Sequence, residues 1–300
     1  MTIVQKRLSV AALVSFALCA VSFLPSVRNP SAPKAFQSVL LNPAYMPDVD
    51  RIDIWQGASA VTLEKTDGQW TVTGEQMTFR ADEKLVQNLL AAASSVRKMY
   101  RISDNDGRSS SASMGISFSH DGTVYTKAYF FGENALTGRV MLAVSSQDAL
   151  YETENDLSPF LHPTVRHWAK PELVQSVVVP QSFVWQEPGK PPVVIGGASP
   201  GFSRSAHDIM VLRHGAVVPA GSGHSVAAAE LTVIGDGTRE RIRFVPQDDG
   251  SFRCDYAATG DPLSDPLSER LSAAVEISGW TFERLQGIFS NSDAAMTVQR

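Results

Sequence analysis

Residues 115–131 read GISFSHDGTVYTKAYFF, and residues 231–245 read LTVIGDGTRERIRFV. In both stretches, short runs rich in β-branched and aromatic residues flank an Asp-Gly pair, which favours the tight turn of a β-hairpin. The two turns, Asp121-Gly122-Thr123 and Asp236-Gly237-Thr238, lie 115 residues apart (236 − 121). Two similar hairpins at this spacing predict a structural unit that occurs twice in the chain.

The elements around each hairpin follow a similar order. Before and after the first hairpin the pattern predicts strands, a helix, further strands and a short helix: strands 52–54, 60–64, 70–72, 124–131 and 139–144, a helix over 80–100 and a short helix over 154–161. Around the second hairpin it predicts strands at 174–179, 183–185, 192–195, 231–234, 241–245 and 252–256, with helices over 203–214 and 266–275.

We therefore expect an α+β protein made of two tandem small α+β units. Each unit is an antiparallel sheet packed with a helix, the first over residues 36–170 and the second, more degenerate, over residues 171–300. The remaining segment, residues 1–35, precedes both units.

That first segment predicts a membrane anchor. Lys6 and Arg7 precede Leu8–Leu24, an uncharged run that forms a helix of about 26 Å, and prolines follow from Pro25 onward. The expected protein is therefore anchored by a single transmembrane helix in the cell (inner) membrane, with the lipid bilayer as a partner and the bulk of the chain extracytoplasmic or periplasmic.

Two processed forms remain open. A signal peptide could be cleaved at Ala20-Val21-Ser22, or a lipid could be attached at Cys19. In every case residues 36–300 are expected outside the cytoplasm.

Five short motifs together indicate a resemblance to a known family. They are Val49-Asp50-Arg51-Ile52-Asp53-Ile54, Leu63–Val72 with its Asp-Gly turn and tryptophan, Arg80-Ala81-Asp82, Ala149-Leu150-Tyr151 and Val165-Arg166-His167-Trp168. With them the chain resembles the domain of unknown function 4340 family, over about residues 49–170 with a weaker echo to about 285. The resemblance implies an anchored extracytoplasmic protein that accompanies ABC transporter components of the gliding-motility type, and it brings no catalytic residues.

Composition excludes several classes. A net charge of −5 gives no basic footprint for nucleic acid, and two cysteines are too few for a disulfide scaffold or a cysteine-rich zinc site. The loop Gly196–Gly201 lacks the Gly-Lys-Ser/Thr of a P-loop and the pattern of a dinucleotide turn.

The sharpest catalytic motif is Gly197-Ala198-Ser199-Pro200-Gly201, which matches the G-x-S-x-G of a nucleophile elbow. In such an elbow the residue after the serine donates its backbone N–H to the oxyanion, and Pro200 has none. We interpret this stretch as a loop between a strand and a helix.

The other candidate sites also have structural interpretations. His162 and His167 are five residues apart, and His207 and His214 seven apart, without a third ligand fixed by spacing. Asp261, Asp265 and Glu269 lie at four-residue intervals, interrupted by prolines. The charges of Arg239, Glu240, Arg241 and Arg243 are interpreted as one solvated strand face. The five tryptophans, Trp55, Trp70, Trp168, Trp185 and Trp280, cap the cores or anchor a protein interface.

The sequence thus predicts no catalytic, cofactor-binding or metal-binding residues and no cofactor. The favoured function is a non-catalytic scaffold or accessory subunit of a membrane complex, and the family resemblance implies an ABC transporter component as its partner. Two alternatives remain: a binding module for a small molecule or glycan, and a serine hydrolase centred on Ser199.

Overall fold

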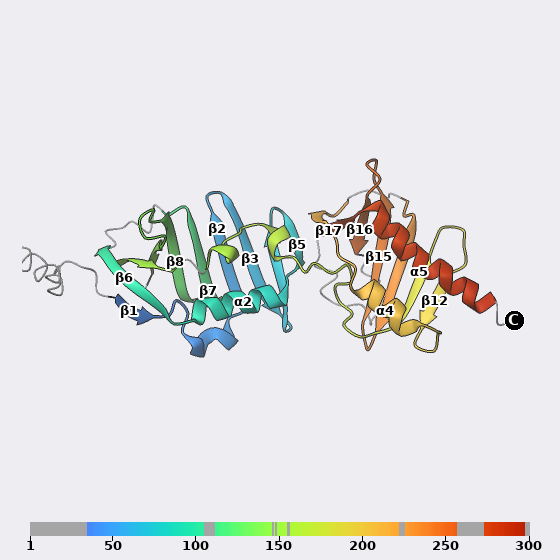
Figure 1. Cartoon of the computed structure of the whole chain (residues 1–300), viewed down its shortest axis with the longest axis horizontal. Helices are drawn as coiled ribbons and strands as arrows, with labels where there is room; N and C mark the ends of the chain where they lie inside the picture. Colours follow the sequence, from blue (N-terminus) through green and yellow to red (C-terminus); the bar gives the residue numbers. More distant parts are fainter. Residues whose placement is uncertain are drawn as a thin grey trace, which may run out of the picture.

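The computed structural model describes residues 35–297, apart from 105–111, 146, 148, 155–156, 222–225 and 257–272. This part of the chain forms seventeen strands in two antiparallel sheets and four α-helices. The two sheets follow one another along the long axis of the molecule (Figure 1). The expectation of two small α+β units is therefore wrong: the described chain is mostly antiparallel sheet, and the first sheet alone has ten strands.

The first sheet has the strand order β1-β6-β10-β9-β8-β7-β2-β3-β4-β5. Neighbouring strands of this sheet are antiparallel, and β2 to β5 and β7 to β10 are neighbours in the chain as well, so hairpins connect them. The strands are β1 (Ala35–Ser38), β2 (Arg51–Gln56), β3 (Ser59–Thr66), β4 (Gln69–Gly74), β5 (Met77–Arg80), β6 (Arg97–Asp104), β7 (Met114–His120), β8 (Thr123–Glu133), β9 (Val140–Val144) and β10 (Ala149–Thr153).

One helix, α2 (Glu83–Ser94), covers a face of this sheet. It begins where the side chain of Asp82 accepts hydrogen bonds from the backbone N–H groups of Lys84 and Leu85. The predicted helix over 80–100 is too long, because the backbone becomes extended at Ser95 and Arg97–Asp104 forms β6. Pairing with β1 and β10 outweighs the helical preference of that stretch.

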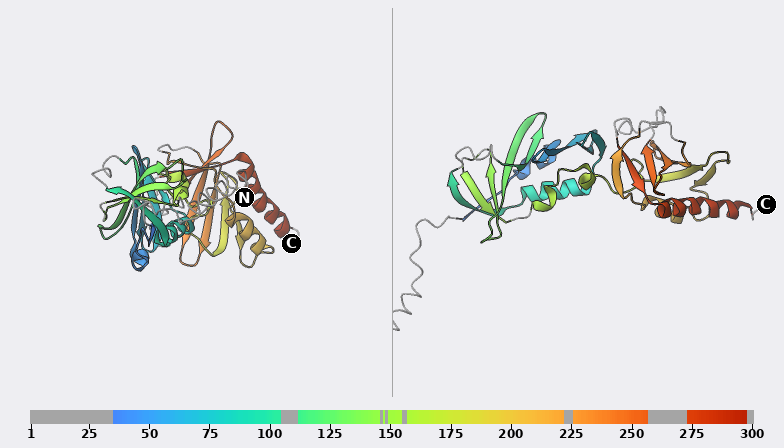
Figure 2. Two further views of the ribbon diagram at one scale, coloured as in Figure 1. Left: turned by 60° about the vertical axis from the view of Figure 1, so that its left-hand side comes forward. Right: turned by 90° about the horizontal axis from the view of Figure 1, so that it is seen from above.

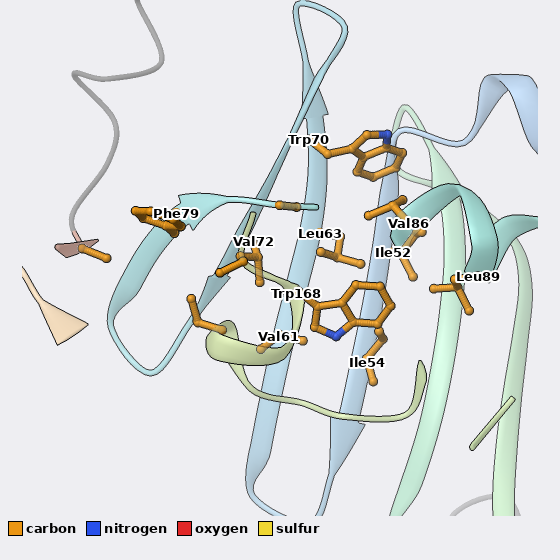
Figure 3. Close-up of a cluster of buried hydrophobic side chains, with 14 of the residues drawn as sticks. Ile52, Ile54, Val61, Leu63, Trp70, Val72, Phe79, Val86, Leu89 and Trp168 are labelled. Atoms are coloured by element: carbon orange, nitrogen blue, oxygen red, sulfur yellow. The ribbon is translucent and has the colours of Figure 1, made fainter. Parts of the chain in front are cut away.

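Trp168 lies at the centre of the first core. It is fully buried and comes from α3 (Val165–Trp168), which packs near β4 and β5. Figure 3 shows its indole among side chains of β2 and β3, including Ile54 and Val61. Its Nε1 donates a hydrogen bond to the backbone carbonyl of His162 at 2.9 Å. The predicted helix at 154–161 is reduced to the 3-10 turn η3 (Ser158–Phe160), and another 3-10 turn, η1 (Pro43–Asp48), precedes β2.

The second sheet has the strand order β12-β11-β14-β15-β16-β17-β13. Its strands are β11 (Pro180–Gln186), β12 (Val193–Gly196), β13 (Ala216–Pro219), β14 (Ala229–Gly235), β15 (Arg239–Pro246), β16 (Phe252–Tyr256) and β17 (Ala273–Ile277).

Two helices, α4 (Phe202–Met210) and α5 (Gly279–Thr297), cover the inner face of the second sheet. In Figures 1 and 2 they lie on the same side of the molecule as α2. Phe289 of α5 stacks on Trp185 with ring centroids 5.2 Å apart, and Phe282 stacks on Phe252 at 3.9 Å. Burial of these large rings fixes α5 to the sheet.

The expected helix over 266–275 is also corrected. Residues 257–272 lie outside the described part, and Ala273–Ile277 is strand β17. The helix that closes the chain follows that strand, and its apolar spacing at Phe282, Leu285 and Phe289 was the sequence signal for it.

The two sheets share a strand order. Seven neighbouring strands of the first sheet lie in the order β6-β10-β9-β8-β7-β2-β3, and the seven strands of the second sheet lie in the order β13-β17-β16-β15-β14-β11-β12. Strands at the same position in the two lists also follow one another in the same order along the chain. A helix precedes the corresponding strands β6 and β13 in each. This is the arrangement that a tandem repeat requires, while the duplication and its boundaries at 36–170 and 171–300 stay a prediction.

The expectation of a single-pass membrane protein is corrected here. Within the described residues, no helix is long and apolar enough to cross a membrane. The run Leu8–Leu24, with Cys19 and the cleavage motif at Ala20, lies outside them. The structure therefore gives no support to the anchor or to the membrane and extracytoplasmic location derived from it.

Candidate functional site

The two sheets meet at a junction rich in buried polar groups. Residues 170–179 connect them and run between β5 and β15, so that the predicted strand at 174–179 is a connecting segment. Among the groups at the junction are Arg80, Lys170, Gln175, His214, Glu240 and Tyr256.

Glu240 organises this junction. Its carboxylate accepts hydrogen bonds from the backbone N–H groups of Gln175 at 2.8 Å, Ser176 at 2.7 Å and Val177 at 3.4 Å. The side chain is 3 % exposed, and burial raises the pKa of the carboxyl, whereas these hydrogen bonds favour its charged form. A carboxylate with three backbone donors acts as an anchor for the connecting segment.

Lys170 is the first residue of the same segment, and its side chain bonds within the segment. Its Nζ donates to the backbone carbonyls of Gln175 at 2.8 Å and Val174 at 3.3 Å. Burial lowers the pKa of this ammonium, while the negative charge of Glu240 acts in the opposite direction. Both ionisable groups therefore bond to the backbone of the connecting segment, Glu240 from β15 and Lys170 from within the segment.

Aromatic groups from both sheets complete the junction. Phe79 of β5 contacts the rings of Tyr256 at 5.7 Å and His214 at 5.8 Å between centroids. The hydroxyl of Tyr256 donates to the carbonyl of Leu173 at 2.8 Å, and Nε2 of His214 lies 2.8 Å from the carbonyl oxygen of Lys170. Burial raises the pKa of Tyr256 and lowers that of His214, so both groups favour their neutral forms.

Hollows on the described surface lie near charged side chains. A cavity of about 240 Å³ adjoins the junction and is lined by Trp70, Arg80, Lys170 and Gln175 among others. A shallower depression of about 440 Å³ lies over β11, β14 and β15, where Glu230 forms an ion pair with Arg241 at 2.5 Å.

The structure corrects the interpretation of the β15 charges. One face of the strand carries the arginines at every second position, Arg239, Arg241 and Arg243, as expected. Glu240 points to the opposite face together with Ile242 and Phe244, and it is buried. The period-two alternation of a strand was the signal for this position, and reading the four charges as one face missed it.

Ser199 serves the loop that contains it. Its Oγ accepts a hydrogen bond from the backbone N–H of Gly196 at 3.0 Å, and its carbonyl accepts from Phe202 at the start of α4. Of the histidines that follow it, His214 faces the carbonyl of Lys170 at the junction and His207 lies exposed on α4. The described contacts of Ser199 are those of a turn between β12 and α4.

The structure brings His162 and His167 together despite their unfavourable spacing. Their ring centroids are 4.4 Å apart, because the chain turns sharply before α3. Burial, with a smaller contribution from His162, lowers the pKa of His167. Asp261, Asp265 and Glu269 lie outside the described residues.

A cluster that the sequence reasoning missed joins Asp50, His120 and Asp121, whose potential metal-ligand atoms all lie within 4.8 Å of one another. Nδ1 of His120 is 2.9 Å from the carboxylate of Asp50, which also accepts from the backbone N–H of Asp121 at 3.1 Å. These contacts already engage Asp50 within the protein. Only the pairing of β2 with β7 brings Asp50 beside the Asp-Gly turn.

The tryptophans divide into two groups. Trp70, Trp168 and Trp185 are buried, as core caps should be. Trp55 lies on the outer face of the first sheet near Lys127, whose Nζ is 5.0 Å from its ring centroid. Trp280 is 67 % exposed and lies beside Arg284, which makes it the tryptophan suited to an interface.

No known protein family, curated protein or solved structure matches this chain. The resemblance to the domain of unknown function 4340 family, and the transporter partner that it implies, therefore stay predictions from the motifs.

Proposed function

We propose that this chain is a non-catalytic scaffold or accessory subunit that binds a protein partner across its two sheets. The observation that carries the proposal is that the buried ionisable groups at the junction are hydrogen-bonded to the backbone of the connecting segment. Glu240 accepts from backbone N–H groups and Lys170 donates to backbone carbonyls. Because the backbone N–H of Lys170 also donates to the carbonyl of Arg80 in β5, the segment that Glu240 holds at β15 is bonded to both sheets.

The open faces of the sheets support the same proposal. The helices cover one side of both sheets, so the opposite faces carry polar and aromatic side chains on strands. Trp55 and Lys127 lie on this face of the first sheet, and Arg241 and Arg243 lie on it in the second. Partly exposed tryptophan and arginine side chains are common in the energetically important parts of protein interfaces.

The test lengthens the connection at the point where it passes from one sheet to the other. Four residues, Gly-Ser-Gly-Ser, are inserted between Lys170, whose backbone N–H donates to the carbonyl of Arg80 in the first sheet, and Pro171, whose carbonyl accepts from the N–H of His214 beside the second sheet. The matched control carries the same insertion between Asp248 and Asp249, in the exposed turn between β15 and β16. Wild type and both variants are crosslinked in cells of the source organism, purified and compared by mass spectrometry.

We expect one set of proteins to be recovered with wild type and the control, and to be lost or reduced at least severalfold with the Lys170/Pro171 insertion. Equal recovery by all three forms would show that the relation between the sheets is irrelevant. Recovery of no specific protein, together with ester hydrolysis that disappears in Ser199→Ala, would replace the proposal by the hydrolase alternative.

A further inference from the structure

His214 forms part of the contact between the two sheets. It lies between α4 and β13 of the second sheet, and its imidazole packs edge-on against Phe79 of β5 in the first sheet, with ring centroids 5.8 Å apart. β5 is the edge strand of the first sheet and lies next to β17 of the second (Figure 1). A change in the state of this imidazole is therefore felt where the sheets meet.

The backbone around His214 binds the start of the connecting segment. The N–H of His214 donates to the carbonyl of Pro171 at 3.1 Å, and the N–H of Leu173 donates to the carbonyl of Leu212 at 2.7 Å. The residues between these two bonds form an isolated antiparallel bridge. We refer to this contact, together with the ring of His214, as the latch, which comprises residues 171–173 and 212–214.

The two nitrogens of the His214 ring have different surroundings. Nε2 lies 2.8 Å from the carbonyl oxygen of Lys170, and because a carbonyl only accepts, the hydrogen of the neutral ring is assigned to Nε2. Nδ1 then carries the lone pair. It is buried and has no hydrogen-bond partner among the described residues. A proton added at Nδ1 would create a buried cationic N–H without an acceptor, which is unfavourable in the closed latch.

The charges around the ring do not offset this cost. Glu172 of the connecting segment favours the protonated ring, but it is partly exposed, and Arg166 of α3 opposes protonation. The neighbouring rings of Phe79 and Tyr256 are uncharged, since burial keeps the phenol of Tyr256 neutral. The other charged groups of the junction are Arg80, Lys170 and Glu240. Burial is the largest influence, and it lowers the pKa of His214.

This preference has a definite sign with respect to pH. The closed latch holds the neutral ring, whereas a ring exposed to water titrates near the ordinary value of 6.5. As pH falls through 6.5, the open form therefore takes up a proton that the closed form does not. The closed form is favoured above this pH and loses stability below it.

We propose that the junction carries an acid-sensitive latch. In acid the ring of His214 takes up a proton at Nδ1 and leaves its place between Phe79 and the carbonyl of Lys170, and residues 171–173 separate from residues 212–214. The latch is a property of the chain by itself, so it holds or fails independently of the proposed scaffold function.

Hydrogen–deuterium exchange of the full-length chain at pH 7.5 and pH 5.5 tests the latch, after correction for the effect of pH on the intrinsic exchange rate. Peptides that contain the amides of Leu173 and His214 report opening. The hairpins of residues 51–66 and 229–246 contain no histidine and serve as references for each sheet. We expect opening of the latch to rise at least about threefold at pH 5.5, since a pKa difference of one unit changes an equilibrium about tenfold, and the references to stay unchanged.

Two glutamine variants separate His214 from other titrating groups. His214→Gln keeps an N–H donor for the carbonyl of Lys170 but takes up no proton, so we expect the rise at pH 5.5 to disappear. His207→Gln is the matched control, because His207 is exposed on α4, and it should keep the rise.

An NMR titration of the His214 ring in wild type gives a second readout. The ring signal is assigned from its absence in His214→Gln, and its pKa should lie below 6.5. This titration decides the matter if His214→Gln already opens the latch at pH 7.5. The proposal would be overturned by a His214 pKa of 6.5 or higher, by a rise that the reference hairpins share equally, by a rise that persists in His214→Gln, or by the absence of any rise.

Discussion

Replacement of Glu240 by glutamine tests the junction most directly. The two oxygens of the carboxylate receive the N–H groups of Gln175, Ser176 and Val177. In Glu240→Gln only one oxygen remains, and the new NH₂ group faces a backbone donor. The variant also leaves the buried ammonium of Lys170 without its nearby negative charge.

The magnitude follows from these losses. One charge-assisted hydrogen bond contributes about 1.5–3 kcal/mol, and removal of one member of a buried charge pair costs about 3–5 kcal/mol. Because glutamine avoids the cost of burying a charge, the lower figures apply. We expect Glu240→Gln to reduce the free energy of unfolding by about 2–3 kcal/mol.

The matched control is Glu230→Gln on the neighbouring strand. Glu230 also pairs with a cation, Arg241, at 2.5 Å, but at the surface, where such pairs contribute about 1 kcal/mol or less. Urea unfolding, followed by far-UV circular dichroism, compares the midpoints and slopes of the two variants with wild type. A loss below about 0.5 kcal/mol in Glu240→Gln, or an equal loss in both variants, would refute the anchoring role of the junction.

Three further predictions concern other parts of the fold. In Gly115→Ala the new Cβ would lie 2.0 Å from the indole of Trp55, so we expect a loss of about 1–3 kcal/mol by urea unfolding, whereas Gly197→Ala, with its nearest atom at 3.9 Å, should change little. Phe282→Ala should cost about 3–5 kcal/mol, measured in the same way, because it empties the space between α5 and the second sheet. Hydrogen bonds, chiefly from Lys190, lower the pKa of Glu187 to about 2, so the stability that this carboxylate gives the fold is complete above the ordinary value of 4.5 and is lost as pH falls through about 2. The difference in melting temperature between wild type and Glu187→Gln should therefore shrink over that interval. A difference that stays constant would contradict this prediction.

The β-hairpins were predictable because their signals are local. Gly122 and Gly237 both have positive φ, at 76° and 68°, in the turns that the Asp-Gly pairs indicated. The start of α2 was equally visible, since Asp82 is a typical N-cap before an apolar helical pattern. The helix over 203–214 was found with small errors at its ends, as α4 spans Phe202–Met210.

Other elements were misread where distant pairing competes with local preference. Residues 97–100 continue a helical pattern in the sequence, but they pair with β1 and β10 as part of β6. Residues 174–179 have the composition of a strand, yet their N–H groups at 175–177 bond to the carboxylate of Glu240, 63–65 residues away in the chain. Local secondary-structure propensity is a weak guide where such long-range contacts determine the conformation of a segment.

The sequence alone therefore determined the turns, the caps and the antiparallel character of the chain, because each depends on the φ angles and side chains of a few neighbouring residues. Only the tertiary structure decided the junction. Glu240 is a buried anchor, and the cavity beside Trp70 and Lys170 exists, because strands far apart in the sequence meet there and exclude water. Burial and long-range hydrogen bonding are properties of the assembled sheets, and no short stretch of residues encodes them by itself.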